Sequence, residues 1–404
     1  MAAWRHSVKR SRLFLVVALG LGIVLTACDG GVVSSKHVKV AVAMPLGLDI
    51  GHDMLNAAQL ALDEAEGMAG DIAVELVSFD TSEPDGNPLS PELEKASAVA
   101  ASDDPAVVGY LGASASDQAR ASLSVLNEAS IVQFSPAATW PGLTKPGFGP
   151  GEPGIYYPTG RRHFFRMTPS DDIQGVAAAR WADQLGMESV YIVDDGTAYG
   201  VGVAGIFEVT IQDLGMRIVD HTAFSADSFT EAQLQALAEK VVESDPDLFF
   251  LGSSFGYGGS DFVRVLRSLD KEIKIMVPDG MVQDQIFTDL GEAAVEGIYA
   301  TNVTIPAEQL RTADAFRERY QSAYGKEPPP YAVNAYEAMQ VLLLAISRAE
   351  TPTREHVLDA VANLGEFSGV LGTWSFSPAG DISLSVISGL QAHHGAWTFV
   401  QVLQ

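Results

Sequence analysis

The stretch AVVGYLGASASDQARASLSVLNEASIVQFSPAAT occupies residues 106–139. It begins with an apolar run at 106–112, continues with a helical pattern at 116–128, and returns to an apolar run at 130–135. A strand, a helix and a second strand in this order predict a βαβ unit with parallel strands. Both runs are apolar at almost every position, which is typical of strands that are covered on both faces.

The same alternation extends over most of the chain. Other apolar runs predict buried strands at 38–44, 72–79, 189–195, 247–253 and 273–279. Helical patterns occur at 53–66, 91–101, 171–185, 201–214, 230–243, 260–269, 308–324 and 331–349. The pattern is interrupted at 141–163, where a Pro- and Gly-rich segment predicts a functional loop or a domain boundary. The segment 372–403 has a β-hairpin pattern. The sequence therefore predicts an α/β protein with two doubly wound parallel-sheet lobes.

The first 28 residues predict a secretory leader. A basic start precedes an apolar segment, Leu13 to Leu25, that is too short for a comfortable membrane span. The segment ends in Leu-Thr-Ala-Cys, which resembles the bacterial lipobox, and Cys28 is the only cysteine of the chain. We expect residues 1–27 to be a signal peptide and residues 28–37 a lipidated tether that holds the protein outside the cytoplasm. A weak transmembrane anchor with a chance cysteine is the alternative interpretation.

Composition and charge limit the possible partners. The chain has 404 residues and a formal net charge of −26. The leader holds four basic and no acidic residues, so the remainder carries −30. Nucleic acid is excluded as a partner because binding it needs a basic surface. A single cysteine allows no internal disulfide. The length predicts two domains rather than one core.

The polar residues that follow the predicted strands are candidates for a ligand site, because ligands of open parallel sheets bind beyond the carboxyl ends of strands. Ser114 and Ser116 follow one strand, and the N–H groups of Ala137 and Thr139, with the Thr139 hydroxyl, follow the next. Such groups can hold a carboxylate. Asp279 follows a strand of the second lobe. An anion site on one lobe and a carboxylate on the other would suit a zwitterion such as an amino acid.

Two motifs suggest other functions, and each has a structural interpretation. Gly200, Gly202 and Gly205 match the GxGxxG dinucleotide pattern. That pattern needs its first glycine directly after the strand, whereas here an acidic DGTAY segment intervenes, so small residues on a closely packed helix are the simpler explanation. The segment GSSFG, 252–256, matches the nucleophile elbow of hydrolases.

A hydrolase would use Ser254 as its nucleophile, with Asp279 and one of three histidines completing the triad: His356, His393 or His394. No HGGG-type oxyanion segment accompanies the motif, and a serine-rich binding loop needs the same residues. The histidines show no metal-ligand spacing, so no metal and no cofactor are predicted.

Residues 38–390 resemble the type I substrate-binding proteins of ABC transporters, and the Leu/Ile/Val-binding family in particular. The resemblance is carried by 107–147, including VVGYLGASAS and ASIVQFSPAATWPGLTKPG, by VYIVDDGTAYGVGVA (190–204), by DLFFLGSSFGYG (247–258), by MVPDG (276–280), by AAVEGIYATN (293–302) and by YAVNAYEAMQVLLLAI (331–346). The SPAAT segment after a strand is fairly specific to this family. One departure is Trp140, which stands where relatives have a small polar residue.

The resemblance implies a set of ligand contacts: Ala113 or Ser114, Ala137, Thr139, Tyr199, Ser254, Phe255 and Asp279. Within this set, Ala137 and Thr139 are expected to hold the ligand carboxylate, and Asp279 its ammonium group. Ser254 and Phe255 fall where relatives have an aromatic residue. No catalytic residue is expected, because the family binds its ligand without breaking a bond.

The resemblance also implies a first lobe of residues 38–166 plus 303–372 and a second lobe of 167–302 plus 373–404. Three chain crossings near 164–168, 300–304 and 370–374 would form the hinge on which the lobes close. The implied function is capture of an amino acid with a branched or similar apolar side chain, by a monomer, for delivery to an ABC transporter permease. The alternatives are a binding protein for an amide or aromatic carboxylate, a sensory component, and a secreted serine hydrolase.

Overall fold

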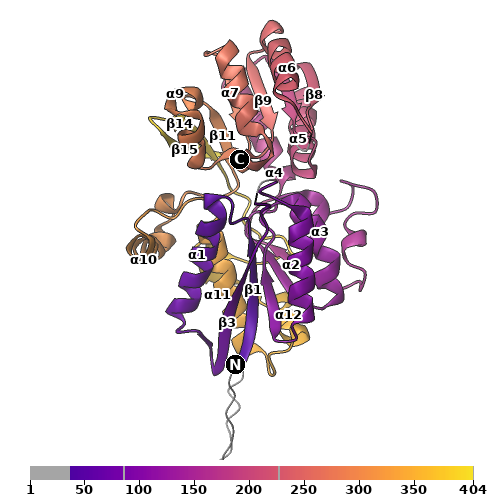
Figure 1. Ribbon diagram of the computed structural model, residues 1–404, viewed down its shortest axis with the longest axis vertical. Coiled ribbons are helices and arrows are strands. Elements are labelled where there is room, and N and C mark those ends of the chain that lie inside the picture. The colour runs from indigo at the N-terminus through magenta and orange to yellow at the C-terminus, as the bar shows by residue number, and fades with distance from the viewer. Residues whose placement is uncertain (1–36, 85–86, 226–227, 404) are drawn as a thin grey trace, which may run out of the picture. The chain divides into compact units, whose positions relative to one another are not determined.

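The computed structural model describes residues 37–84, 87–225 and 228–403. The predicted leader, Cys28 and most of the tether lie outside this part of the chain. Two sheets, each flanked by helices on both faces, organise the described residues into two lobes (Figure 1). Within these residues, no helix combines the length and the hydropathy needed to cross a bilayer.

The first lobe is built on a six-stranded sheet of order β2-β3-β1-β4-β5-β6, which is parallel except for β2. Its strands are β1 (His37–Met44), β2 (Met68–Ala69), β3 (Ile72–Asp80), β4 (Val107–Leu111), β5 (Val132–Ser135) and β6 (Phe164–Arg166). Helices α1 and α11 pack together on one side of the sheet, and α2 and α3 on the other. The helices of this lobe are α1 (Asp49–Glu64), α2 (Pro91–Asp103), α3 (Ser116–Glu128), α10 (Asp314–Tyr324), α11 (Ala332–Arg348) and α12 (Arg354–Ala362).

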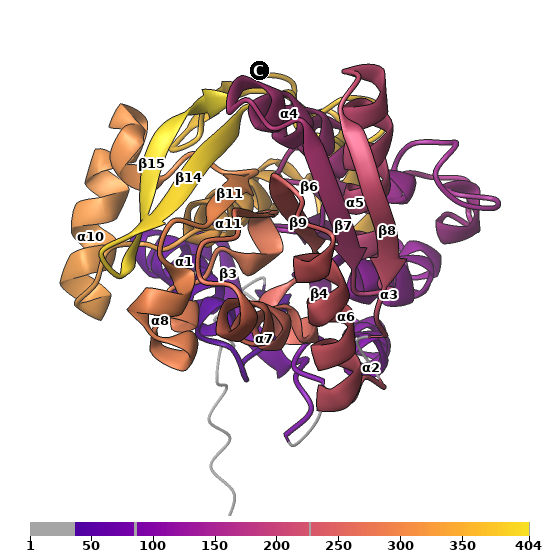
Figure 2. The same cartoon turned by 90° about the horizontal axis from the view of Figure 1, so that it is seen from above.

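The second lobe is built on a seven-stranded sheet of order β15-β14-β11-β10-β9-β7-β8, with the antiparallel hairpin β14–β15 along one edge and β8 along the other (Figure 2). Its strands are β7 (Ser189–Asp194), β8 (Arg217–Ala223), β9 (Leu248–Gly252), β10 (Ile275–Val277), β11 (Tyr299–Asn302), β14 (Ile387–His393) and β15 (Ala396–Leu403). Its helices are α4 (Asp171–Gln184), α5 (Ala198–Asp213), α6 (Glu231–Glu243), α7 (Gly259–Leu269), α8 (Gln285–Leu290) and α9 (Glu292–Val295).

The predicted α/β fold class is confirmed, and its central βαβ unit is β4, α3 and β5. Every residue of β4 and β5 is buried, as expected for strands covered on both faces. The two strands pair in parallel, with Leu111 opposite Phe134. Their carboxyl ends therefore lie side by side, which brings the turn after β4 next to the SPAAT turn after β5.

The chain passes between the two sheets after β6, after β11 and between β13 (Gly372–Trp374) and β14. Strand β13 pairs only with β12 (Phe367–Gly369). The third crossing comes later than expected. Phe376 packs against Phe134 and Phe165, and Asp381 pairs with Arg166, so residues that were assigned to the second lobe still belong to the first.

The Pro- and Gly-rich segment 141–163 folds onto the first lobe instead of linking two domains. It contains two short 3₁₀ turns, Pro141–Leu143 and Gly154–Tyr156. Leu143 and Tyr156 are buried in one cluster with apolar residues of α3. The Arg120 side chain of α3 donates a hydrogen bond to the Tyr156 hydroxyl at 2.8 Å. These contacts hold the segment in an ordered conformation against α3.

Candidate ligand-binding cleft

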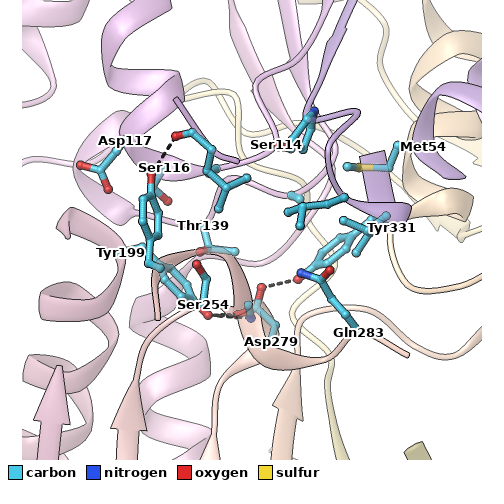
Figure 3. A pocket seen from close by; sticks show the side chains of 18 residues that line it. Met54, Ser114, Ser116, Asp117, Thr139, Tyr199, Ser254, Asp279, Gln283 and Tyr331 are labelled. Carbon is cyan, nitrogen blue, oxygen red and sulfur yellow. Dashed lines mark hydrogen bonds between the residues drawn. The ribbon is translucent and has the colours of Figure 1, made fainter. Parts of the chain in front are cut away.

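A cavity of about 60 Å³ lies between the two lobes, and Figure 3 shows it from close by. Its 18 lining residues come from the segments after β1, β3, β4, β5, β9 and β10 and from the starts of α1, α5 and α11. Most of these segments follow the carboxyl end of a parallel strand. The cavity therefore lies where ligands of open α/β sheets bind.

Six of the residues expected to contact a ligand line this cavity: Ser114, Ala137, Thr139, Tyr199, Ser254 and Asp279. Ala113 and Phe255 do not. Ala113 is fully buried, and its carbonyl accepts a hydrogen bond from the Ser135 hydroxyl at 2.6 Å. Phe255 packs in the hydrophobic core of the second lobe. At both places the neighbouring serine, Ser114 or Ser254, lines the cavity instead.

Asp279 is the best-defined polar group of the cavity. It follows β10 at the start of a 3₁₀ turn and is only 3% exposed. The Tyr199 hydroxyl donates to one carboxylate oxygen at 2.7 Å, and the Tyr331 hydroxyl donates to the other. Burial raises the pKa of Asp279, and the hydrogen bonds from Tyr331 and Tyr199 offset part of that rise. The two hydrogen bonds orient the carboxylate, and within the described part of the chain it has no ion-pair partner.

A second buried carboxylate, Asp171, lies next to this site and was missed in the sequence. Asp171 is the first residue of α4, and its N–H donates to the Thr139 carbonyl at 3.0 Å. Burial and the nearby Asp279 carboxylate raise the pKa of Asp171 well above its usual value. Neither of its side-chain oxygens has a hydrogen-bond partner among the described residues. Two consecutive acidic residues at the start of a helix are favourable for the helix itself, so Asp171 gives no separate signal of a site in the sequence.

The cavity wall carries two carboxylates, Asp117 and Asp279, and none of its 18 residues is Lys or Arg. Asp117 forms an ion pair with Arg120 at 3.6 Å, whereas no ion pair to Asp279 is found among the described residues. The positive charge of the fully buried Arg166 counters part of the rise in the pKa of Asp171. Buried charges are normally paired or ligand-bound. A cationic group in the cavity would therefore meet a prepared partner.

The turn after β4 offers a different kind of contact. Ser114 and Ser116 line the cavity, and Ser116 is the first residue of the 13-residue helix α3. The first N–H groups of a helix have no partner within the helix, and together with the helix dipole they favour an anion. Serine hydroxyls at the same place add further donors.

The expected role of Ala137 in holding an anion is not supported by the geometry. Its N–H, which was expected to be unobstructed, donates to the Ser135 hydroxyl at 3.3 Å. Ala138 donates to the same hydroxyl at 2.8 Å. Thr139, in turn, lies beside the carboxylate of Asp171. An anion at this turn would face two buried carboxylates, so the start of α3 is the better anion site.

One wall of the cavity is apolar, and it comes mainly from the connection between β1 and α1. The residues that form it are Pro45, Leu48, Ile50, Met54 and Leu89. Tyr257 and Tyr331 complete the enclosure. Sequence reasoning missed this wall because Leu48, Ile50 and Met54 fit the apolar pattern of a core helix. An apolar ligand side chain placed here would be removed from water, which stabilises binding by about 25 cal/mol per Å² of apolar surface.

Two glycines of the GxGxxG pattern allow close packing of α5 against neighbouring residues. Gly200 and Gly202 lie on α5, and a Cβ at position 200 would come within 2.1 Å of the Asp195 carboxylate. Asp195 in turn accepts hydrogen bonds from the Thr197 hydroxyl (2.6 Å) and the Ser253 hydroxyl (2.9 Å). An acidic residue thus occupies the position where a phosphate would have to bind.

The hydrolase interpretation fails on geometry within the described residues. The Ser254 hydroxyl has no hydrogen-bond partner there, so no histidine activates it. His356 lies on α12 of the first lobe and contacts the Thr351 carbonyl. His393 contacts Glu296 near the β14–β15 turn. The three elements of a triad are therefore not assembled.

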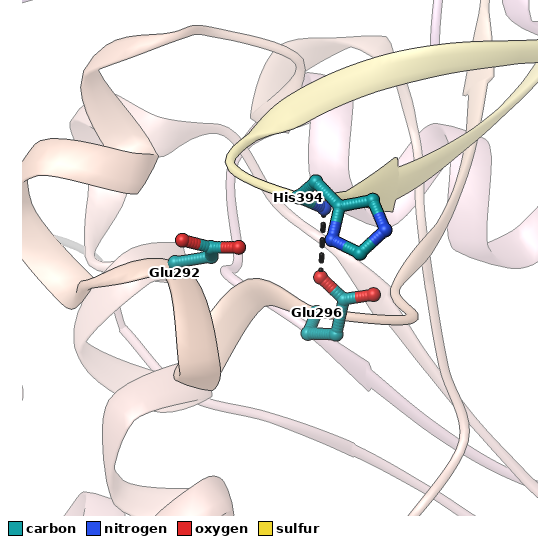
Figure 4. Close-up of side chains that lie close together, drawn as sticks. All are labelled: Glu292, Glu296 and His394. Carbon is teal, nitrogen blue, oxygen red and sulfur yellow. Dashed lines mark hydrogen bonds between the residues drawn. The ribbon is translucent and has the colours of Figure 1, made fainter.

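Glu292, Glu296 and His394 form the one group of three among the described residues whose ligand atoms lie close enough together to share a metal ion (Figure 4). The group lies on the surface, where α9 meets the β14–β15 turn, and none of the three lines the cavity. Glu296 accepts a hydrogen bond from the His394 N–H at 3.0 Å. The spacing of the histidines does not reveal this group, because Glu296 and His394 are 98 positions apart in the chain.

Comparison with known proteins identifies the family. Residues 45–384 match the family described as periplasmic binding protein. The Leu/Ile/Val-binding protein homolog 1 of Brucella abortus is 26% identical over 264 residues, which are 64% of this chain and 65% of that protein, so the match spans just under two-thirds of the relative.

Solved structures share the fold. The leucine-binding protein LivK of Thermotoga maritima has a TM-score of 0.76 and 26% identity, over 91% of this chain and 99% of that one. A solute-binding protein of an R. palustris ABC transporter, in complex with benzoate, has a TM-score of 0.74 and 17% identity, over 91% and 96% of the two chains. Because the family match spans most of the chain, this protein belongs to the type I periplasmic binding proteins, within the Leu/Ile/Val-binding family.

Proposed function

We propose that the protein is an extracytoplasmic solute-binding lipoprotein that captures an amino acid with an apolar side chain and delivers it to an ABC transporter permease. The observation that carries the proposal is the composition of the cavity. Asp279 lines the cavity as a buried carboxylate with no ion pair among the described residues, Asp171 lies buried beside it, and the same cavity has an apolar wall. The names of the relatives, a Leu/Ile/Val-binding protein homolog and a leucine-binding protein, support the same class of ligand.

The charges suggest one orientation for the ligand. Its ammonium group lies between Asp279, Asp171 and the Thr139 hydroxyl, and its carboxylate lies at the start of α3 beside Ser114 and Ser116. Its side chain points to the apolar wall. Charge-assisted hydrogen bonds of this kind contribute about 1.5–3 kcal/mol each. Three of them, together with apolar burial, are enough for the roughly 8 kcal/mol that a Kd of about 1 μM requires.

A ligand without an ammonium group is the less favourable alternative. An aromatic carboxylate would bring only negative charge to a cavity that already contains Asp279 and has Asp171 behind it. The likeness to the benzoate-bound R. palustris protein is a likeness of fold. An amide would leave the buried Asp279 carboxylate without the cationic partner that an ammonium group supplies.

Capture follows from closure of the two lobes on the three chain crossings, which buries the ligand and presents surfaces of both lobes to the permease. The protein acts as a monomer, anchored by lipid at Cys28. Cys28→Ser should therefore move the protein from the membrane fraction to the soluble fraction, as measured by fractionation and immunoblotting. A variant that stays in the membrane fraction would refute the lipid anchor and favour an uncleaved membrane segment.

A thermal-shift screen of the purified protein against the standard amino acids tests the proposed ligand class. A ligand at 100 times its Kd should stabilise the folded state by about 2.7 kcal/mol. Leucine analogues make the test specific, because 4-methylpentanoate lacks the ammonium group and 3-methylbutylamine lacks the carboxylate. We expect both to bind more weakly than leucine. Binding of 4-methylpentanoate as tight as that of leucine would contradict the role of the buried carboxylates.

A further inference from the structure

Trp140 lies at the boundary between the two lobes but does not line the cavity. It belongs to the first lobe and is held there by several contacts. Its indole N–H donates to the buried Glu152 carboxylate at 3.0 Å, and its backbone N–H donates to the Ser116 hydroxyl at 3.0 Å. Its ring also packs edge-on against Phe148. The ordered segment 141–163 therefore acts as a support for this side chain.

The six-membered part of the Trp140 indole meets the second lobe at Gly202. Gly202 lies on α5, and a Cβ at that position would come within 2.2 Å and 2.4 Å of two ring carbons, Cζ3 and Cε3 of Trp140. The indole thus occupies space that only a residue without a side chain leaves open. Gly202 is the residue of the second lobe that accommodates Trp140.

Other direct contacts join the lobes around this point. The Ala198 N–H, at the start of α5, donates to the Asp117 carboxylate at 3.1 Å. The Tyr257 hydroxyl of the second lobe donates to the Leu89 carbonyl of the first at 2.9 Å. None of these contacts needs a ligand. They form when the two lobes are together and must be broken when the lobes separate.

We propose that Trp140 is a positioning residue for closure, whose indole is held by Glu152 in the first lobe and seats against Gly202 on α5 in the second. The contact stabilises the closed arrangement and so raises the affinity for the ligand of the cavity without touching that ligand. The inference rests on the proposed function, in which binding requires closure. The apparent Kd equals the intrinsic Kd divided by the fraction of molecules that are closed, so a weaker contact between the lobes raises the apparent Kd.

Two glycines of the same helix provide a matched test. Gly202→Ala places a methyl group against the Trp140 ring, whereas Gly205→Ala places one where nothing lies within 4 Å. Both changes raise helix propensity equally. Calorimetric titration with the amino acid identified in the screen should show a Kd that is about 5- to 150-fold higher for Gly202→Ala, as overpacking of 1–3 kcal/mol implies. The Kd of Gly205→Ala should match that of the wild type.

Trp140→Ala tests whether the Trp140 ring is the group that the added methyl of Gly202→Ala meets. In that background Gly202→Ala should change the Kd by less than twofold, because the methyl group then has no ring to meet. Equal Kd values for Gly202→Ala and Gly205→Ala would overturn the proposal. So would an effect of Gly202→Ala that persists undiminished in the Trp140→Ala background.

A measurement without ligand separates this proposal from the proposed function. Small-angle X-ray scattering of the ligand-free protein should give a larger radius of gyration for Gly202→Ala than for Gly205→Ala, because the lobes of the first variant close less completely. If no amino acid binds the wild-type protein but this difference appears, the ligand class is wrong and the closure contact stands. If amino acids bind but the two variants scatter alike and have the same Kd, the closure contact is wrong.

Discussion

Asp279→Asn should raise the Kd for the amino-acid ligand by at least about 30-fold. Removing one partner of a buried, hydrogen-bonded charge pair costs about 2–5 kcal/mol, which is roughly 30-fold to several-thousand-fold in Kd. Asn keeps the size of the side chain and can still accept a hydrogen bond from Tyr199 or Tyr331. The loss of affinity should therefore come from the missing charge. In calorimetric titrations, Asp279→Asn should weaken binding of the amino acid but not binding of its analogue without the ammonium group.

The ligand-free Asp279→Asn protein should be as stable as the wild type, or slightly more stable, at neutral pH. Burial raises the pKa of Asp279 in the folded state. When folding raises the pKa of an acidic group, the free energy of unfolding falls as the pH rises above the pKa that the group has in the unfolded chain. The reason is that ionising the group costs more in the folded protein. Asn carries no charge and removes that cost. Urea unfolding without ligand at pH 7 measures this effect, and weaker binding together with a large loss of stability would point to misfolding instead.

Asp261→Asn is a suitable control for the general negative potential of the cleft. Asp261 is on α7 and lines a neighbouring pocket that shares Asp117 and Tyr257 with the ligand cavity; its side chain is 41% exposed and pairs with Arg264 at 2.6 Å. A long-range electrostatic effect would weaken binding in both variants and would decline with added salt. We expect Asp261→Asn to change the Kd by less than twofold. An equal loss in the two variants would contradict direct contact between Asp279 and the ligand.

Much of the fold was predictable because its strands are strongly apolar and its helices strongly periodic. The helix expected at 116–128 is α3, with the same bounds. Strand β8 was missed because it is an edge strand of sequence RIVDHTA with no fully buried residue, so its pattern is not continuously apolar. Strand β6 was missed because it has only three residues, and its neighbours in the sheet rather than its own sequence determine its conformation.

The candidate site was predictable only where a polar loop directly follows an apolar strand. Thr139 and Asp279 meet that condition. Asp171 does not, because it starts a helix after the missed strand β6. Tyr331 comes from the start of α11, and its contact with Asp279 depends on how the two lobes meet. Groups that converge from distant segments leave no local signal in a single sequence, and the predicted contacts therefore included Asp279 and Tyr199 but neither Tyr331 nor Asp171.

Arg166→Met should lower the free energy of unfolding by about 3–5 kcal/mol, the usual cost of removing one partner of a buried ion pair. Arg166 is fully buried at the end of β6, directly before the first crossing between the lobes. Its guanidinium lies 2.7 Å from the Asp381 carboxylate and donates to the Trp140 carbonyl at 3.0 Å and to the Thr144 hydroxyl at 2.6 Å. The Arg166 side chain thus connects β6, the segment before β14 and residues 140–144, which follow β5.

The size of this effect depends on the charge that the substitution leaves behind. Asp381 is 16% exposed as a side chain, so it would stay largely buried without a cation after Arg166→Met. Asp381→Asn in the same chain should therefore recover part of the lost stability, because a neutral pair costs less than a single buried charge. Arg264→Met, which breaks an exposed ion pair, should cost less than about 1 kcal/mol. Urea unfolding of the four proteins measures all of these values, and a loss for Arg166→Met as small as that for Arg264→Met would show that the ion pair does not hold the crossing together.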